Sequence, residues 1–170
     1  MQILFENKLY TEPSEFEKIL AGTGVFAEKW PIEHLNPETL HIAQEVLPQI
    51  KTELDAFKTQ FQYETEDVVC LSPNTPDLDK KLEAFKAPHY HTDDEVRLTL
   101  AGQGVFTIYP APNAPSIEIT VEAGDMIVVP ADTMHAFWLT EKQSITAVRI
   151  FKTNPKWEAI YEWPSKKVCP

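Results

Sequence analysis

Residues 89–109 read HYHTDDEVRLTLAGQGVFTIY, with strand-like runs at 95–100 and 104–109 behind a histidine-rich start. Both runs are rich in apolar and β-branched residues, and the Ala-Gly-Gln-Gly sequence between them predicts a turn. Four more runs of this kind follow, at 116–121, 125–129, 136–139 and 145–151. Short strands at this spacing predict an antiparallel barrel or jelly roll.

The N-terminal half predicts helices and a few strands that flank this barrel. Strands are expected at 1–10, 25–30 and 68–71. Helices are expected at three places: after an N-cap at Ser14, from Asn36-Pro37 to about Phe61 with a break or kink at Pro48, and over 77–86. The predicted fold class is therefore mostly β, with N-terminal α/β elements, a jelly-roll barrel and flanking helices.

One domain is expected over residues 1–170, because a chain of this length can bury a full hydrophobic core. Within it, residues 1–87 would pack on the barrel, residues 88–151 would form the barrel core, and residues 152–170 would be a tail whose aromatic side chains pack back. Cys70, in the apolar run 68–71, is expected to be buried, and Cys169 exposed, without a disulfide.

The acidic composition argues against two classes of partner. A net charge of −11 is opposite to what nucleic acid or an anionic membrane surface requires. No apolar run approaches the ~20 residues that span a bilayer, and the first residues lack the pattern of a signal peptide. We expect a soluble, cytoplasmic protein, and a monomer.

Three of the five histidines form the most informative pattern in the chain. His89 and His91 are two residues apart, so a strand would point both side chains to one face. Glu95 can join them if the polar residues 92–94 make a solvated bend. A histidine on a strand is usually packed or hydrogen-bonded, but His135 offers a fourth donor. Three imidazoles and one carboxylate suit Fe(II), Ni(II), Mn(II) or Zn(II).

Two motifs around these residues resemble those of the cupin superfamily. The first is His89-x-His91-x3-Glu95-x6-Gly102, without the leading glycine of the pattern, and the second is Gly124-x5-Pro130 followed by His135. Asp132 and Leu139 stand where a glycine and an asparagine are usual. Aspartate tolerates the left-handed turn conformation better than most residues, so the first departure is mild.

A longer series of positions, in order and spacing, is similar to the acireductone dioxygenase family within that superfamily. It consists of His91-x3-Glu95-Val96-Arg97, Gly102-x-Gly104-x-Phe106, Gly124-Asp125-x-Ile127-Val128-Val129-Pro130-x3-Met134-His135-x-Phe137 and Val148-Arg149-x-Phe151. Trp30, the long predicted helix and Asp67-Val68-Val69-x-Leu71-x-Pro73 extend the resemblance over nearly the whole chain.

This resemblance implies a metal-dependent dioxygenase of methionine salvage, whose partners are O2 and the small molecule acireductone (1,2-dihydroxy-3-keto-5-methylthiopentene). With Fe(II), such enzymes cleave acireductone to formate and 4-methylthio-2-oxobutanoate. With Ni(II), they yield formate, carbon monoxide and 3-methylthiopropionate. The resemblance implies that one Fe(II) or Ni(II) per chain is held by His89, His91, Glu95 and His135.

Four further side chains are candidates for catalysis or substrate binding. Arg97 shares the inward face of its strand with Glu95, and would bind substrate oxyanions or pair with Glu95 or another acid as a buried ion pair. Arg149 either faces the pocket as a second cation or forms a structural salt bridge. Phe85 and Phe137 match family positions that wall the substrate, and either could equally be a core aromatic.

Two other interpretations stay open. Another cupin enzyme, such as a zinc isomerase or a different oxygenase, would keep the four metal ligands. It has no reason, however, to keep the two arginines and the two phenylalanines together. A storage or small-molecule-binding cupin would share the fold but typically loses metal ligands.

Overall fold

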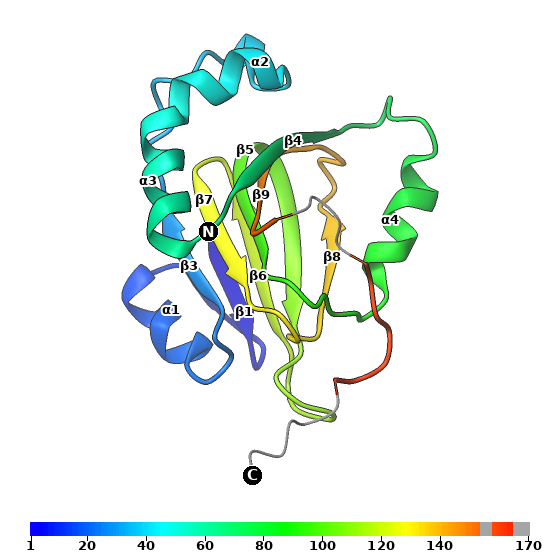
Figure 1. The fold of residues 1–170 in the computed structure, drawn as a ribbon. Helices are drawn as coiled ribbons and strands as arrows, with labels where there is room; N and C mark the ends of the chain where they lie inside the picture. Colours follow the sequence, from blue (N-terminus) through cyan, green and yellow to red (C-terminus); the bar gives the residue numbers. More distant parts are fainter. Residues whose placement is uncertain (154–157, 165–170) are drawn as a thin grey trace.

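The computed structural model describes residues 1–153 and 158–164. Nine strands in this part of the chain form a curled antiparallel sheet, with helices along its sides (Figure 1). The strands are β1 (Gln2–Phe5), β2 (Lys8–Tyr10), β3 (Phe26–Lys29), β4 (Thr65–Leu71), β5 (Glu95–Ile108), β6 (Ile117–Glu122), β7 (Asp125–Val129), β8 (His135–Leu139) and β9 (Ile145–Phe151). The helices are α1 (Pro13–Leu20), α2 (Ala43–Val46), α3 (Lys51–Phe61) and α4 (Leu78–Lys86), with 3₁₀ turns at Pro37–Thr39 and Leu47–Ile50. The predicted fold class is confirmed.

The long strand β5 joins the two halves of the curled sheet. Its residues 95–102 pair with β7 and β9, whereas residues 103–108 pair with β6 and β8. The register shifts between Thr99 and Ala101, and Gly102 has a φ of +77°. A Cβ atom at Gly102 would lie 2.1 Å from the carbonyl oxygen of Ser144, so the position requires glycine. The turn predicted over residues 101–104 is therefore wrong, because a bulge with a glycine bends one continuous strand there.

The two faces of the sheet bury separate cores. On the outer face, Val96, Leu98 and Leu100 of β5 belong to a cluster that includes Leu54 and Phe57 of α3. Side chains alternate along a strand, so Glu95 and Arg97 must leave β5 on the opposite face. That inner face carries the second cluster, which includes Phe106, Ile127 and Phe137. Glu95 and Arg97 thus point into the barrel.

The N-terminal strand and the first helix differ from the prediction in detail. Residues 1–10 form a hairpin of β1 and β2, because Glu6 and Asn7 both take positive φ and reverse the chain. Helix α1 begins at Pro13, whose φ suits a first helical turn. Ser14 consequently lies inside the helix, and its predicted role as N-cap is wrong.

The long helix predicted between residues 36 and 61 is interrupted. Asn36 does act as a cap, since its side chain accepts a hydrogen bond from the amide of Glu38 at 3.1 Å, but the capped segment is a single 3₁₀ turn. Pro48 lies in the second 3₁₀ turn, and only α3 after it is a regular helix of several turns. The break expected at Pro48 is thus present, and it is accompanied by a second one near residue 40.

Two expectations about the edges of the molecule have different outcomes. Cys70 is exposed, so its predicted burial is wrong; the other residues of β4 are only half-buried, so the apolar run around Cys70 is not enclosed on both faces. Ile160 in the tail forms a backbone bridge with Tyr90, so this part of the tail does pack back. Trp157 and Cys169 lie outside the described residues. The division of residues 1–170 into one domain of three parts stays a prediction.

No helix in the described part of the chain is long and apolar enough to cross a membrane.

Candidate metal centre

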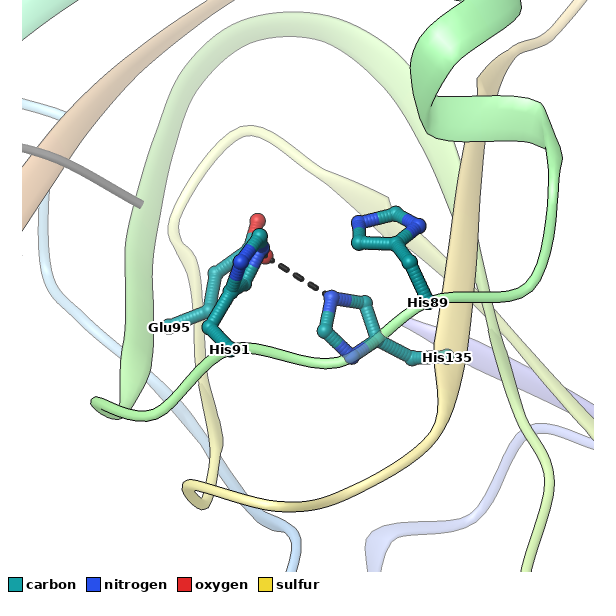
Figure 2. Close-up of side chains that lie close together, drawn as sticks. All are labelled: His89, His91, Glu95 and His135. Atoms are coloured by element: carbon teal, nitrogen blue, oxygen red, sulfur yellow. Dashed lines mark hydrogen bonds and ion pairs between the residues drawn. The ribbon is translucent and has the colours of Figure 1, made fainter. Parts of the chain in front are cut away.

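Four side chains from three segments meet inside the barrel. His89 and His91 lie between α4 and β5, Glu95 is the first residue of β5, and His135 is the first residue of β8. The backbones of His89 and His135 exchange two hydrogen bonds, of 2.8 and 2.7 Å, which join the two distant segments. Residues 92–94 form the predicted bend. All four predicted ligands therefore point toward one another (Figure 2).

Each imidazole is oriented by a backbone carbonyl. The Nδ1–H groups of His89, His91 and His135 donate to the carbonyls of Ala87, Glu158 and Thr133, at 2.8, 2.9 and 2.8 Å respectively. A carbonyl oxygen can only accept, so Nδ1 carries the hydrogen and Nε2 of each neutral ring carries the lone pair. This arrangement is typical of metal-binding histidines, whose second nitrogen is held by a hydrogen bond.

The donor atoms fit a divalent metal ion. They lie within 4.8 Å of one another, and none of the four residues is more than 4% exposed. Nε2 of His135 and Nε2 of His91 lie 2.9 and 3.2 Å from Oε2 of Glu95. With neutral rings these three atoms are all acceptors, which repel one another unless a cation lies between them. Imidazole nitrogens and a carboxylate oxygen suit Fe(II), Ni(II), Mn(II) or Zn(II).

Burial and neighbouring charges keep His89 and Glu95 in the protonation states that metal binding requires. Burial, with smaller contributions from His135 and His91, lowers the pKa of His89 to about 4 despite the opposing backbone hydrogen bond with Ala87. Burial raises the pKa of the Glu95 carboxyl, but the neighbouring positive charge, above all that of Arg97, lowers it more, to well below its usual range. At neutral pH, His89 is neutral and Glu95 is ionised.

Arg97 lies directly beside the metal ligands. It is 6% exposed, and its Nε–H donates to Oε1 of Glu95 at 2.5 Å. Its guanidinium carbon lies 5.2 Å from the ring centroid of Phe137 and 6.0 Å from that of Phe106. The buried ion pair with Glu95 is therefore present, and it sets a permanent cation next to the four donors. The substrate role of Arg97 stays a prediction.

Arg149 is a partner of Asp67 and a neighbour of Arg97 at the same time. Its Nε–H donates to Oδ1 of Asp67 on β4 at 2.7 Å, and a second nitrogen contacts Oδ2. It also lies opposite Arg97 in the register of β5 and β9, so both arginines leave the sheet on the inner face. The structural salt bridge is thus present on the face that carries the metal ligands. A catalytic role for Arg149 stays a prediction.

Aromatic rings lie near the donor set and near Arg97. Phe137 packs on Phe106 with a centroid distance of 5.0 Å, and Phe85 of α4 lies 6.4 Å from the imidazole of His89. Both predicted wall residues also contact the inner core, so the wall and the core interpretations are compatible. The ring of Tyr161 lies 6.1 Å from that of His89, and the sequence predicted only that tail aromatics pack back. The sequence did not predict that Tyr161 lies next to a metal ligand.

Asp94 has an unforeseen position. The sequence predicts a solvated side chain in the bend, but that of Asp94 is only 16% exposed. It accepts hydrogen bonds from the hydroxyl of Tyr63 and the amide of Ala131, both at 2.9 Å. Lys152 forms an ion pair with it at 2.8 Å. No local sequence signal marks this residue, because all three partners are distant in the chain.

The chain is similar to known proteins over almost its whole length. The model of the ARD/ARD′ family matches residues 27–159. Acireductone dioxygenases of Exiguobacterium sibiricum and Bacillus subtilis are 37% and 36% identical to it, over 94% and 92% of this chain and 94% and 91% of their own lengths. A solved structure of acireductone dioxygenase from Bacillus anthracis, with a cadmium ion in its active center, is 34% identical. It superposes with a TM-score of 0.85 over 94% of this chain and 97% of that one.

Proposed function

Because this chain belongs to the ARD/ARD′ family, we infer that it is a metal-dependent dioxygenase that cleaves acireductone with O2 in methionine salvage. The observation that carries the inference is the convergence of His89, His91, Glu95 and His135 inside the barrel. Their buried donor atoms fit a divalent ion, and the Bacillus anthracis relative holds a cadmium ion in its active center. Another cupin enzyme would keep the same four ligands, and the family match over nearly the whole chain is what favours acireductone as the substrate.

A divalent ion held by these four residues would supply a Lewis acid and a template that orients the oxygens of the substrate. The ligands contribute three neutral imidazoles and one carboxylate, so the site keeps a net positive charge. That charge attracts the ionised ene-diol of acireductone. The carbonyls behind the imidazoles hold the rings in place, so little reorganisation accompanies substrate binding.

Arg97 would act on the substrate rather than on the metal alone. A guanidinium stays charged and offers a planar set of donors to an oxyanion. Beside Glu95 it would favour the ionised form of the ene-diol and hold one of its oxygens. Arg149, on the same inner face, would add a second positive charge. Phe137 and Phe85 would wall the substrate and keep water away from it.

The bound metal would decide the products. With Fe(II), acireductone and O2 give formate and 4-methylthio-2-oxobutanoate. With Ni(II), they give formate, carbon monoxide and 3-methylthiopropionate, and both outcomes conserve the atoms of one substrate and one O2. The same donor set accepts either ion, and intrinsic affinity favours nickel. We propose one Fe(II) or Ni(II) per chain.

The deciding experiment is turnover of synthetic acireductone under O2. Metal-free protein is reloaded separately with Fe(II) and with Ni(II), and the keto acid and carbon monoxide are quantified. Keto acid from the iron form and carbon monoxide from the nickel form are expected, with neither from His91→Ala. If both forms bind metal stoichiometrically but leave acireductone unconsumed above background, the dioxygenase assignment is wrong and the metal site remains.

We further propose that the enzyme acts as a monomer in the cytoplasm. The four ligands all come from one chain, so the site is complete without a second copy. Sedimentation of the metal-loaded protein tests this, since a stable dimer at micromolar concentration would contradict the monomer.

A further inference from the structure

The metal ligands flank two loops whose positions relative to each other must stay fixed. His91 and Glu95 stand at the two ends of the bend formed by residues 92–94, and His135 follows the loop of residues 130–134. His89 is tied to His135 through the backbone, whereas Glu95 pairs with Val129, at the other end of this loop from His135. The position of the carboxylate relative to His135 therefore depends on the conformation of this loop and on how the bend contacts it.

The loop itself is a tight turn. The amide of Thr133 donates to the carbonyl of Pro130 at 3.2 Å, and Asp132 has a φ of +61°. A positive φ at the third residue is the backbone of a type II turn. Strand β8 starts two residues after this turn, so displacing the turn displaces His135.

Two hydrogen bonds join the bend to this turn. The amide of Asp132 donates to the carbonyl of His91 at 2.9 Å, and the amide of Ala131 donates to Oδ1 of Asp94 at 2.9 Å. The first uses backbone atoms alone and survives any side-chain substitution. The second depends on the Asp94 side chain, and Asp94 immediately precedes the ligand Glu95.

The other carboxylate oxygen of Asp94 binds a different part of the fold. Its Oδ2 accepts from the hydroxyl of Tyr63, just after α3, and pairs with Nζ of Lys152, just after β9. Tyr63 is buried and stacks on Phe57 at a centroid distance of 5.6 Å. One oxygen of Asp94 thus contacts the turn before His135, while the other is anchored to α3 and β9.

We propose that Asp94 is a positioning residue for the metal centre: it fixes the distance between Glu95 and His135 by holding the amide of Ala131. The proposal rests on the proposed function only in that the four residues hold a metal ion. Asp94 binds neither metal nor substrate. Its contribution is to hold two ligands at the spacing that the ion requires, as outer residues of metal sites do.

The test compares the two oxygens of Asp94. Asp94→Ala removes both, whereas Asp94→Asn keeps a carbonyl oxygen for the amide of Ala131 and loses the charge that pairs with Lys152. Tyr63→Phe and Lys152→Met remove the partners of Oδ2 alone. Asp93→Asn is the matched control for charge. Asp93 lies in the same bend, and its Oδ1 accepts from the amide of Asp94 and lies 3.9 Å from Nζ of Lys152, so neither contact reaches the turn before His135.

The readout is the rate at which Ni(II) leaves the loaded protein to excess chelator, together with the Ni(II) dissociation constant. Asp94→Ala is expected to weaken Ni(II) binding about 10- to 100-fold, mainly through faster release. Asp94→Asn and the three control variants are expected to stay close to the original protein, even where their thermal stability falls. A residue that only stabilises the fold would lower thermal stability without changing Ni(II) release below the unfolding transition.

The proposal is overturned if folded Asp94→Ala releases Ni(II) at the rate of the original protein, or if Tyr63→Phe accelerates release as much as Asp94→Ala does. Should Asp94→Ala not fold, Asp94→Ser takes its place, because a serine hydroxyl does not reach as far as the carboxylate; faster release again supports the proposal and an unchanged rate overturns it. Failure of the proposed function is a separate result, namely Ni(II) bound by the original protein without turnover of acireductone.

Discussion

Arg97 on β5 and Arg149 on β9 lie directly opposite each other, and both side chains leave the sheet on its inner face. Like charges placed opposite each other destabilise a sheet unless something neutralises them. Here each arginine has its own acid, Glu95 at 2.5 Å for Arg97 and Asp67 at 2.7 Å for Arg149. The two pairs differ in burial, because Arg97 is enclosed with the metal ligands whereas Arg149 and Asp67 are partly exposed. Substitutions at the two arginines should therefore act differently.

Replacing Arg97 by methionine should destabilise the metal-free protein far more than the metal-loaded protein. Without the guanidinium, the carboxylate of Glu95 is a buried charge with no cation, which costs about 3–5 kcal/mol of unfolding free energy. A bound divalent ion supplies that cation, so most of the loss should disappear on loading. Urea unfolding with chelator and with saturating Ni(II) measures both values. An equal loss in both conditions would contradict this account of the pair.

The same variant separates the substrate role of Arg97 from its structural role. We expect Arg97→Met, loaded with metal, to lose about 100-fold in kcat/KM for acireductone, the effect of removing an oxyanion donor. Arg97→Lys keeps the charge but not the planar set of donors, so it should recover stability more than turnover. Normal turnover by metal-loaded Arg97→Met would show that Arg97 is not a catalytic residue.

Arg149 and Asp67 can be separated by a double-mutant cycle. Their pair is partly exposed, so the coupling energy in urea unfolding should be only about 0.5–1 kcal/mol. If Arg149 also acts on the substrate, Arg149→Met should lower kcat/KM about tenfold, which corresponds to about 1.4 kcal/mol of activation free energy. Asp67→Asn should then keep most of the kcat/KM of the original protein. Equal kinetic losses in the two single variants would instead assign Arg149 to the salt bridge alone.

The metal ligands could be predicted from the sequence because their signal is local. His89 and His91 stand two residues apart, Glu95 follows across a short polar bend, and only His135 requires a long-range assumption.

The turn predicted at Gly102, which divided β5 into two strands, was wrong for a physical reason. A glycine between two strand-like runs is compatible with a turn or with a bulge, and only the pairing of β5 with strands on both sides distinguishes them.

The role of Asp94 could not be predicted, because its contacts are not encoded near it. The polar residues 92–94 have the composition of a solvated bend. Asp94 is buried because it contacts Tyr63, Ala131 and Lys152, which belong to segments far from it in the sequence. The donor from Ala131 is a backbone amide. A backbone donor leaves no trace in the sequence.

Stability at high pH should depend on Lys58. Its Nζ donates to Glu66 at 2.6 Å and lies 3.5 Å from Asp55. Burial lowers the pKa of Lys58, but the hydrogen bonds and charges of both acids raise it more, so its pKa in the folded protein lies above the ordinary 10.5. The folded state then binds the proton more tightly than the unfolded state. The resulting stability is present below the ordinary pKa and is lost as the pH rises through the folded value.

Lys58→Met should therefore lower the unfolding free energy by about 1 kcal/mol near neutral pH, and by less once the pH exceeds the pKa of Lys58. Urea titrations across the alkaline range give the unfolding free energy of both proteins at each pH. The difference between the two values removes the contribution of the other titrating groups. Lys51→Met, in the exposed pair with Asp55, is the control and should change little at any pH. A difference that stays constant through the alkaline range would show that Lys58 contributes by packing alone.

The absence of a side chain at Gly104 leaves room for the Phe137 ring. A substitution at Gly104 therefore displaces this ring of the proposed substrate wall without changing a metal ligand. A Cβ atom at Gly104 would lie 2.5 and 2.6 Å from two ring carbons of Phe137, so the ring must move in Gly104→Ala. Overpacking of this kind costs about 1–3 kcal/mol of unfolding free energy. Because the ring also lies over Arg97, its displacement should raise the KM for acireductone more than it lowers kcat. The affinity for Ni(II) should hardly change, since the Nδ1 contact of His135 is untouched.

The double variant Gly104→Ala/Phe137→Leu distinguishes the wall from the core. Leucine occupies less space beside the new methyl group, so the stability lost in Gly104→Ala should largely return. The KM should stay high, because the aromatic wall is then missing. If KM recovers together with stability, Phe137 is a core residue whose displacement had only disturbed its surroundings. If KM never rises in either variant, the substrate does not contact this ring, and the wall must be sought on the side of Phe85.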